Sequence, residues 1–163
     1  ILSVLLGPFT SAPLVPFAIL LWGKWETFGL LWSGWLLGGL ISYAIGRYAG
    51  YPLVTRITSG QKVDAWREFV LHQKTFFLAF LFRLAMPSET GYVFGLVGYP
   101  AWKFTFITIL AEAPIAAAII FVGDALIARN LVSFIVGISV AFGLFTLSIL
   151  LLRRNLKKIQ KER

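Results

Sequence analysis

The chain has 163 residues, of which 58% are hydrophobic and 13% are charged. A soluble domain of this size buries only about 70% of the surface of its unfolded chain, so it could not hide this much apolar surface from water. Because there is no cysteine, the sequence also excludes thiol catalysis, disulfides and cysteine-based metal sites. We therefore expect a single all-α integral membrane domain over residues 1–163.

A net charge of +8 is typical of proteins that bind nucleic acid, so nucleic acid is one partner to consider. The basic residues, however, gather in region 47–74 and in the tail 153–163, and both regions flank apolar segments. Basic flanks of membrane helices stay in the cytoplasm and meet anionic lipid headgroups. We therefore expect membrane lipids rather than nucleic acid as partners, and we leave a homo-oligomer open. We also expect a bacterial-type plasma membrane, with both basic regions on its cytoplasmic side.

The first segment, residues 1–22, is apolar but contains Pro8, Pro13 and Pro16. Proline lacks a backbone N–H and breaks the interior of a helix, which argues against one straight spanning helix. We expect a proline-broken re-entrant hairpin with its turn between Thr10 and Pro16, followed by a polar loop at residues 23–26. Because the chain begins with Ile rather than Met, we expect the true N-terminus to be missing.

Three later segments are long and apolar enough to span a hydrocarbon core of about 30 Å. They are residues 27–48, 102–122 and 131–152. The first carries glycine and serine at spacings of three to five, which predicts close packing against another helix. We expect the second to be interrupted at residues 112–114, where Pro114 frees the carbonyl of Leu110.

An amphipathic segment lies between the first two spans. In residues 61–74, Val63, Trp66 and Phe69 share one face at helical spacing, which predicts a helix on the membrane surface. The one histidine, His72, has no second ligand or nucleophile nearby in the sequence, so we expect a solvated surface role for it.

A polar stretch between two apolar runs is the most informative part of the chain. It contains Arg83, Pro87, Ser88, Glu89, Thr90 and Gly91. A charged side chain costs about 2.5–3.5 kcal/mol at the bilayer centre on insertion scales, so charges there mark functional sites. Broken backbone at membrane depth survives only where protein covers it or a watery cavity wets it. We expect residues 76–99 to form a second re-entrant hairpin that enters from the cytoplasm.

The two hairpins would enter the membrane from opposite faces. With both basic regions in the cytoplasm and Lys24 and Arg129 outside, three spans suffice only if residues 76–99 dip in and return. The two halves also resemble each other, because each hairpin precedes an aromatic–basic corner and a span rich in small residues. We therefore expect an inverted repeat, the architecture that many secondary transporters use for binding at the bilayer midplane.

Residues 38–47, Gly-Gly-Leu-Ile-Ser-Tyr-Ala-Ile-Gly-Arg, resemble the Gly-Asp-x-x-x-Tyr-x-x-Gly-Arg signature of the DedA family, also called the SNARE-associated or VTT-domain family. Phe82-Arg83 with Pro87 resembles its Phe-x-Arg-x-x-Pro motif, and residues 87–89 resemble its Pro-Gly/Ser-Glu turn. The chain departs from the pattern at three points. The family's aspartate falls on Gly39, the Arg-to-Pro spacing is one residue longer, and Thr90 stands nearest the second family arginine.

This resemblance implies lipid transport. Bacterial members of the family are implicated in returning undecaprenyl phosphate across the membrane, and eukaryotic relatives in scrambling phospholipids. A polyprenyl phosphate needs a cationic group for its head and an apolar lateral exit for its tail.

The candidate substrate-binding or proton-coupling residues are Arg83, Glu89, Glu112, Arg47, Ser88 and Thr90, and the candidate hinge residues are Pro13, Pro16, Pro87, Gly91 and Pro114. Arg83 could pair with a lipid phosphate or form a structural ion pair with Glu89 or Glu112. Glu89 or Glu112 could take the proton that offsets charge, or could serve as a helix cap or hydrogen-bond partner. Arg47 could anchor the helix end or bind a headgroup.

These features favour a proton-coupled lipid transporter of the flippase or scramblase type. A membrane assembly factor without transport activity remains an alternative. An intramembrane enzyme is less favoured, because one histidine, no cysteine and no clustered carboxylates provide neither a nucleophile–base pair nor metal ligands. We expect no catalytic residue, no metal and no cofactor.

Overall fold

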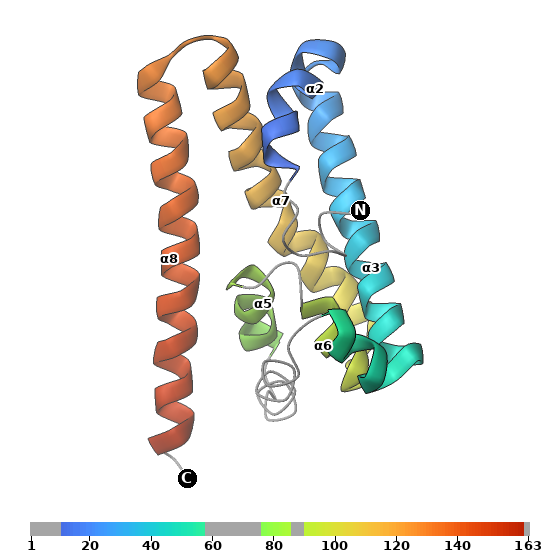
Figure 1. Ribbon diagram of the computed structural model, residues 1–163. Coiled ribbons are helices and arrows are strands. Elements are labelled where there is room, and N and C mark those ends of the chain that lie inside the picture. Colours follow the sequence, from blue (N-terminus) through green and yellow to red (C-terminus); the bar gives the residue numbers. More distant parts are fainter. Residues whose placement is uncertain (1–10, 58–75, 86–89, 162–163) are drawn as a thin grey trace.

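The computed structural model describes residues 11–57, 76–85 and 90–161 (Figure 1). Every regular element in these ranges is a helix, which confirms the all-α class. The elements are η1 (Ala12–Leu14), α2 (Val15–Trp22), α3 (Lys24–Ile57), α5 (Phe76–Ala85), α6 (Thr90–Leu96), α7 (Ala101–Ile127) and α8 (Leu131–Lys161). The predicted surface helix 61–74, with His72, lies outside the described residues.

Three helices are long and apolar enough to cross a membrane: Lys24–Tyr51 of α3, Ala101–Ile127 of α7 and Leu131–Leu151 of α8. At a rise of about 1.5 Å per residue, each of them exceeds the hydrocarbon thickness. Large apolar side chains on these helices, such as Leu37, are half exposed. Outward-facing apolar surface on helices of this length is typical of lipid contact, so the three predicted spans are confirmed and the chain is an integral membrane protein.

Pro13 and Pro16 begin helices rather than break one. Pro13 lies in the first turn of η1 and Pro16 in the first turn of α2. The first N–H groups of a helix have no partner within it, so proline is tolerated there. The chain then turns at Gly23, whose φ is 87°, and α3 begins at the next residue. The predictions of a turn reaching Pro16 and a polar loop at residues 23–26 are therefore wrong, because one glycine with positive φ suffices for the turn.

α7 runs from Ala101 to Ile127 with Pro114 inside it. The predicted interruption at residues 112–114 is therefore wrong, since a proline removes one hydrogen bond of the helix while its neighbours keep theirs. Trp32 of α3 donates its indole N–H to the carbonyl of Ile109 at 3.3 Å, next to the Leu110 carbonyl that the sequence singled out. α3 itself bends at Gly50, where φ is 70° and ψ is −171°.

The helices α3, α7 and α8 alternate in direction (Figure 1). The charged residues near their termini therefore lie at two opposite ends of the bundle. Lys24 at the start of α3 pairs with Asp124 near the end of α7, at 3.4 Å between Nζ and Oδ2. The turn between α7 and α8 lies at this same end. Arg47 of α3 and Arg154 of α8 lie toward the other end.

Two short apolar helices lie in opposite halves of the bundle (Figure 1). The segment Ala12–Trp22 packs against α7 and α3, and Phe76–Ala85 packs against α8 and α7. Each is about 15 Å long, roughly half the thickness of a hydrocarbon core, so neither could span a membrane alone.

α6 packs against α3 almost backbone to backbone. A Cβ built at Gly46 of α3 would collide with the carbonyl of Tyr92, and one built at Gly91 of α6 would collide with Oγ of Ser42. Small residues permit this approach between membrane helices. The predicted small-residue face of the first span is thus confirmed, and its partner is α6.

Candidate functional site

A buried ion pair joins two helices in the middle of the bundle. Arg83, in the last turn of α5, is 1% exposed, and Glu112, halfway along α7, is 2% exposed. Nη2 of Arg83 pairs with Oε1 of Glu112, and Nη1 donates to Oγ1 of Thr90 at 2.9 Å. Three of the predicted site residues, from α5, α6 and α7, therefore meet at one guanidinium. Of the two carboxylates considered, Glu112 is the partner seen here.

α3 completes the site with a residue that has no side chain. A Cβ built at Gly39 would lie 3.0 Å from Nη2 of Arg83, 3.3 Å from Cγ2 of Thr108 and 3.8 Å from Oε1 of Glu112. The glycine therefore leaves room for the guanidinium where a larger residue would crowd it. The ring of Phe104 also faces Arg83, at 5.8 Å from Cζ to the ring centroid, a cation–π geometry that favours the buried charge.

The pair is incompletely satisfied. Nε of Arg83, Oε2 of Glu112 and Oγ1 of Thr108 are buried and have no hydrogen-bond partner among the described residues. Guanidinium and carboxylate can form two parallel hydrogen bonds, and one is formed here. A buried polar atom left unpaired costs about 1–3 kcal/mol. The ion pair therefore leaves one donor of Arg83 and one acceptor of Glu112 unused.

An aromatic cluster closes the site toward the end of the bundle that carries Arg47. Phe104 lies about 12 Å before Glu112 along α7. Its ring stacks on Tyr43 at 5.0 Å and contacts Phe94 at 5.5 Å, and Phe94 contacts Tyr99 at 4.9 Å. The hydroxyl of Tyr43 donates to the carbonyl of Tyr99. These contacts separate the ion pair from the aqueous phase on that side.

Arg47 lies outside this centre. It is exposed, and a Cβ built at Gly98 would collide with its Nη1. Gly98, with φ 70°, follows α6, where its N–H donates to the carbonyl of Gly95 at 3.0 Å. A cation near the C-terminal end of a helix is favourable. The geometry therefore favours the helix-end anchor among the two roles considered for Arg47.

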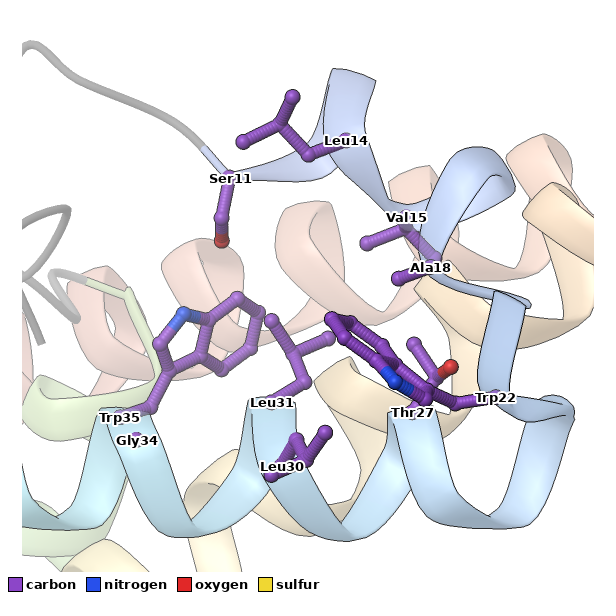
Figure 2. Close-up of a pocket in the computed structure, with 10 residues that line it drawn as sticks. All are labelled: Ser11, Leu14, Val15, Ala18, Trp22, Thr27, Leu30, Leu31, Gly34 and Trp35. Carbon is purple, nitrogen blue, oxygen red and sulfur yellow. The ribbon is translucent and has the colours of Figure 1, made fainter. Parts of the chain in front are cut away.

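An apolar groove of about 230 Å³ opens between η1–α2 and α3 (Figure 2). Its lining residues are Ser11, Leu14, Val15, Ala18, Trp22, Thr27, Leu30, Leu31, Gly34 and Trp35. The hydroxyl of Thr27 donates its hydrogen bond to the carbonyl of Gly23 at 2.7 Å, so this donor is already used and is not available to a ligand. Leu14 and Leu30 on its rim are 67% and 58% exposed, which leaves the groove open at the side of the bundle.

The remaining predicted site residues are placed as follows. Pro87, Ser88 and Glu89 lie outside the described residues. Gly91 packs against Ser42, and Pro114 is exposed on α7. Within the described part of the chain, no three His, Cys, Asp or Glu residues come together as metal ligands would.

Sequence reasoning missed Thr108 and the role of Gly39. The signal for Thr108 was its spacing, because residues four apart on a helix share a face and Glu112 was already a candidate. Gly39 was noticed only as a departure from a family signature, and its contact with Arg83 depends on how α3 packs against α5 and α7.

Comparison with known families gives one match. A family model for the VTT domain matches residues 8–125, which extend from before η1 to near the end of α7 and include both Arg83 and Glu112. No curated protein and no solved structure matches the chain.

Proposed function

Because the chain belongs to the VTT-domain family, the DedA family, we propose that it moves a lipid with a phosphate-bearing headgroup across the bilayer. The observation that carries this proposal is the buried, half-satisfied guanidinium of Arg83. Replacing a buried ion pair by apolar side chains is often neutral or stabilising, so stability alone does not require the pair. A guanidinium matches the geometry of phosphate oxygens and remains charged at any working pH.

In this mechanism Arg83 exchanges one anionic partner for another. While Glu112 is ionised, its carboxylate occupies Nη2 of Arg83 and a lipid phosphate must compete for that position. When Glu112 takes up a proton, it loses its charge and the guanidinium becomes free for the phosphate. Loss of the proton restores the ion pair and releases the headgroup. Each cycle therefore links one proton to one headgroup.

The groove between α2 and α3 suits the lipid tail. Its walls are almost entirely apolar (Figure 2), and Leu14 and Leu30 beside it are largely exposed. A hydrocarbon chain lying there would stay in an apolar medium while the headgroup moved through the protein. This is the lateral exit that a lipid substrate needs.

We propose that the short helices belong to two re-entrant hairpins related as an inverted repeat. Ala12–Trp22 and Phe76–Ala85 are each too short to span the bilayer, and they lie in opposite halves of the bundle. Both short helices also pack against α7, which carries Glu112. We assign the end with Arg47 and Arg154 to the cytoplasm, following the bias of basic residues.

Translocation by the purified chain in vesicles tests the function. We expect wild-type protein to move a fluorescent phospholipid or a polyprenyl phosphate in a pH-dependent manner. Arg83→Gln should slow translocation about 10–100-fold, the worth of one charge-assisted contact. Glu112→Gln, which mimics the protonated acid, should bind the headgroup more tightly but lose the pH dependence. Lys103→Gln removes a charge elsewhere on α7 and should behave as wild type.

Two results would contradict the proposal in different ways. If both site variants translocate lipid at the wild-type rate and pH dependence, Arg83 and Glu112 are not the site. If wild-type protein moves none of the lipids in sealed vesicles, an assembly role without transport becomes the better reading.

A further inference from the structure

Three buried side chains surround one point at the centre of the bundle. Arg83, Glu112 and Thr108 are 1%, 2% and 0% exposed. Thr108 and Glu112 are one turn apart on the same face of α7, and Nη2 of Arg83, Oε1 of Glu112 and the methyl Cγ2 of Thr108 lie within 4 Å of the position where Gly39 would carry a Cβ. Each keeps one polar atom without a partner among the described residues, namely Nε, Oε2 and Oγ1.

The hydroxyl of Thr108 differs from other threonine hydroxyls of this bundle. A threonine within a helix commonly donates to the carbonyl one turn before it. Thr105 of α7 does so, to Ala101 at 2.9 Å, and Thr27 of α3 does so, to Gly23 at 2.7 Å. Oγ1 of Thr108 makes no such bond to its own helix. Its donor and acceptor positions are therefore not used by the described residues.

We propose that Thr108, Glu112 and Arg83 form a binding site for one water molecule, and that this water delivers the proton to Glu112. Nε–H of arginine only donates, an ionised carboxylate oxygen only accepts, and a hydroxyl does both. One water can accept from Nε, donate to Oε2 and share its third bond with Oγ1, which matches the roughly three bonds of a typical buried water. A phosphate oxygen fits this position poorly, because it only accepts and would face the carboxylate.

The chemical step is a proton transfer. A proton from the aqueous phase reaches the water, and the water passes one proton to Oε2 of Glu112. The water is thereby regenerated, and the carboxyl becomes neutral. This step rests on the proposed function, in which the neutral carboxyl releases Arg83 for the headgroup.

Within the part of the chain that the structure describes, few other titratable groups lie on the helices around Glu112. Arg83 faces Glu112 from α5. α3 contributes Tyr43, whose hydroxyl is bonded to the carbonyl of Tyr99, and α6 contributes Tyr92. α2, residues 27–46 of α3 and the membrane part of α8, residues 131–151, contain no charged residue. Glu89 lies outside the described residues.

Infrared spectroscopy of the full chain in vesicles, without lipid cargo beyond the bilayer, tests the water site. The carboxyl band of Glu112 is identified by its loss in Glu112→Gln. We expect an O–H band that shifts in water labelled with heavy oxygen, because only a bound water carries that label. Thr108→Val keeps the side-chain shape and removes the hydroxyl. It should abolish this band and move the carboxyl band to higher frequency, as a hydrogen bond is lost.

Matched variants separate this role from a structural one. Thr105→Val, on the same helix, should leave both bands unchanged, and Thr108→Ser should restore both. Proton-linked translocation should fall about tenfold in Thr108→Val, the worth of one hydrogen bond.

A wild-type spectrum without the label-sensitive band, or a Thr108→Val carboxyl band identical to that of wild type, would overturn the water site while leaving the transport proposal standing. Bands that behave as expected in a protein that moves no lipid would overturn the transport proposal and leave the water site.

Discussion

Arg83 and Glu112 depend on each other for burial, and this dependence can be measured apart from transport. Glu112→Gln leaves a buried guanidinium without a counter-charge. We expect it to lower the free energy of unfolding by about 3–5 kcal/mol, the usual cost of breaking a buried pair. The double variant Arg83→Met, Glu112→Leu removes both charges and should return to within about 1 kcal/mol of wild type. Thermal or denaturant unfolding in detergent micelles gives these values.

The same double variant should move no lipid, because it keeps the packing but has no charged group. A stable and inactive protein is therefore the expected outcome. A double variant as unstable as Glu112→Gln would show that the site cannot be filled by apolar side chains. The pair would then be structural, contrary to the exchange of partners proposed above.

The sequence predicted the chemistry of this site better than its geometry. The cost of a charge in lipid marks Arg83 and Glu112 from position alone. The pairing of Arg83 with Glu112 depends on how α5 packs against α7, because the two residues are 29 positions apart in the chain and no local pattern encodes that contact. The spacing of four residues places Thr108 on the same face as Glu112, but only the structure shows that its hydroxyl lacks the common bond to its own helix.

The contact between α3 and α6 predicts a strong effect from adding one methyl group. In Gly46→Ala the new Cβ would collide with the backbone carbonyl of Tyr92, so α6 must move. We expect a loss of at least about 1–3 kcal/mol in unfolding free energy, the range for overpacked cores. Gly29→Ala is the control, because a Cβ there meets nothing within 4 Å. It should be neutral or should stabilise the helix by up to about 1 kcal/mol. Equal destabilisation by both variants would contradict the close approach.

If the groove between α2 and α3 holds the lipid tail, substitutions at two glycines of α3 should affect translocation differently. Gly34 lines the groove, whereas Gly29 points into open space. We expect Gly34→Phe to fill the groove and to slow translocation of long-chain lipids more than that of short-chain lipids, since a longer tail needs more of the apolar wall. Gly29→Phe should leave both rates unchanged. Parallel assays with two chain lengths make the comparison, and equal effects on both lengths would rule out a tail site.

Elements were predicted best where they depend only on local sequence. The three spans follow from the length and apolarity of continuous segments, and they lie where the sequence placed them. The turns were predicted less well, because the rule that proline breaks helices cannot tell a first turn from an interior. Pro16 occupies a first turn and is harmless there, and Pro114 occupies an interior position that α7 tolerates.

For the molecule as a whole, the distribution of charge along the sequence and the direction of the helices assign the same charged residues to the same end of the bundle. Lys24 and Asp124 meet at one end of the bundle, and Arg47 and Arg154 lie toward the other. Basic residues predicted this grouping because they hold their flanks on one side of a bilayer. The pairing of α5 with α8, by contrast, follows from packing between distant segments, and no local sequence pattern predicts it.

Sidedness is tested by single cysteines, for which this cysteine-free chain is a ready background. In oriented vesicles, a membrane-impermeant thiol reagent should label Arg129→Cys and Arg154→Cys from opposite faces. If residues 76–99 dip in and return, Ser88→Cys should react only from the face of Arg154→Cys, and it should react more slowly because the tip of such a hairpin lies deeper. Labelling of Ser88→Cys from the face of Arg129→Cys would mean that this segment crosses the bilayer, and the inverted repeat would be wrong.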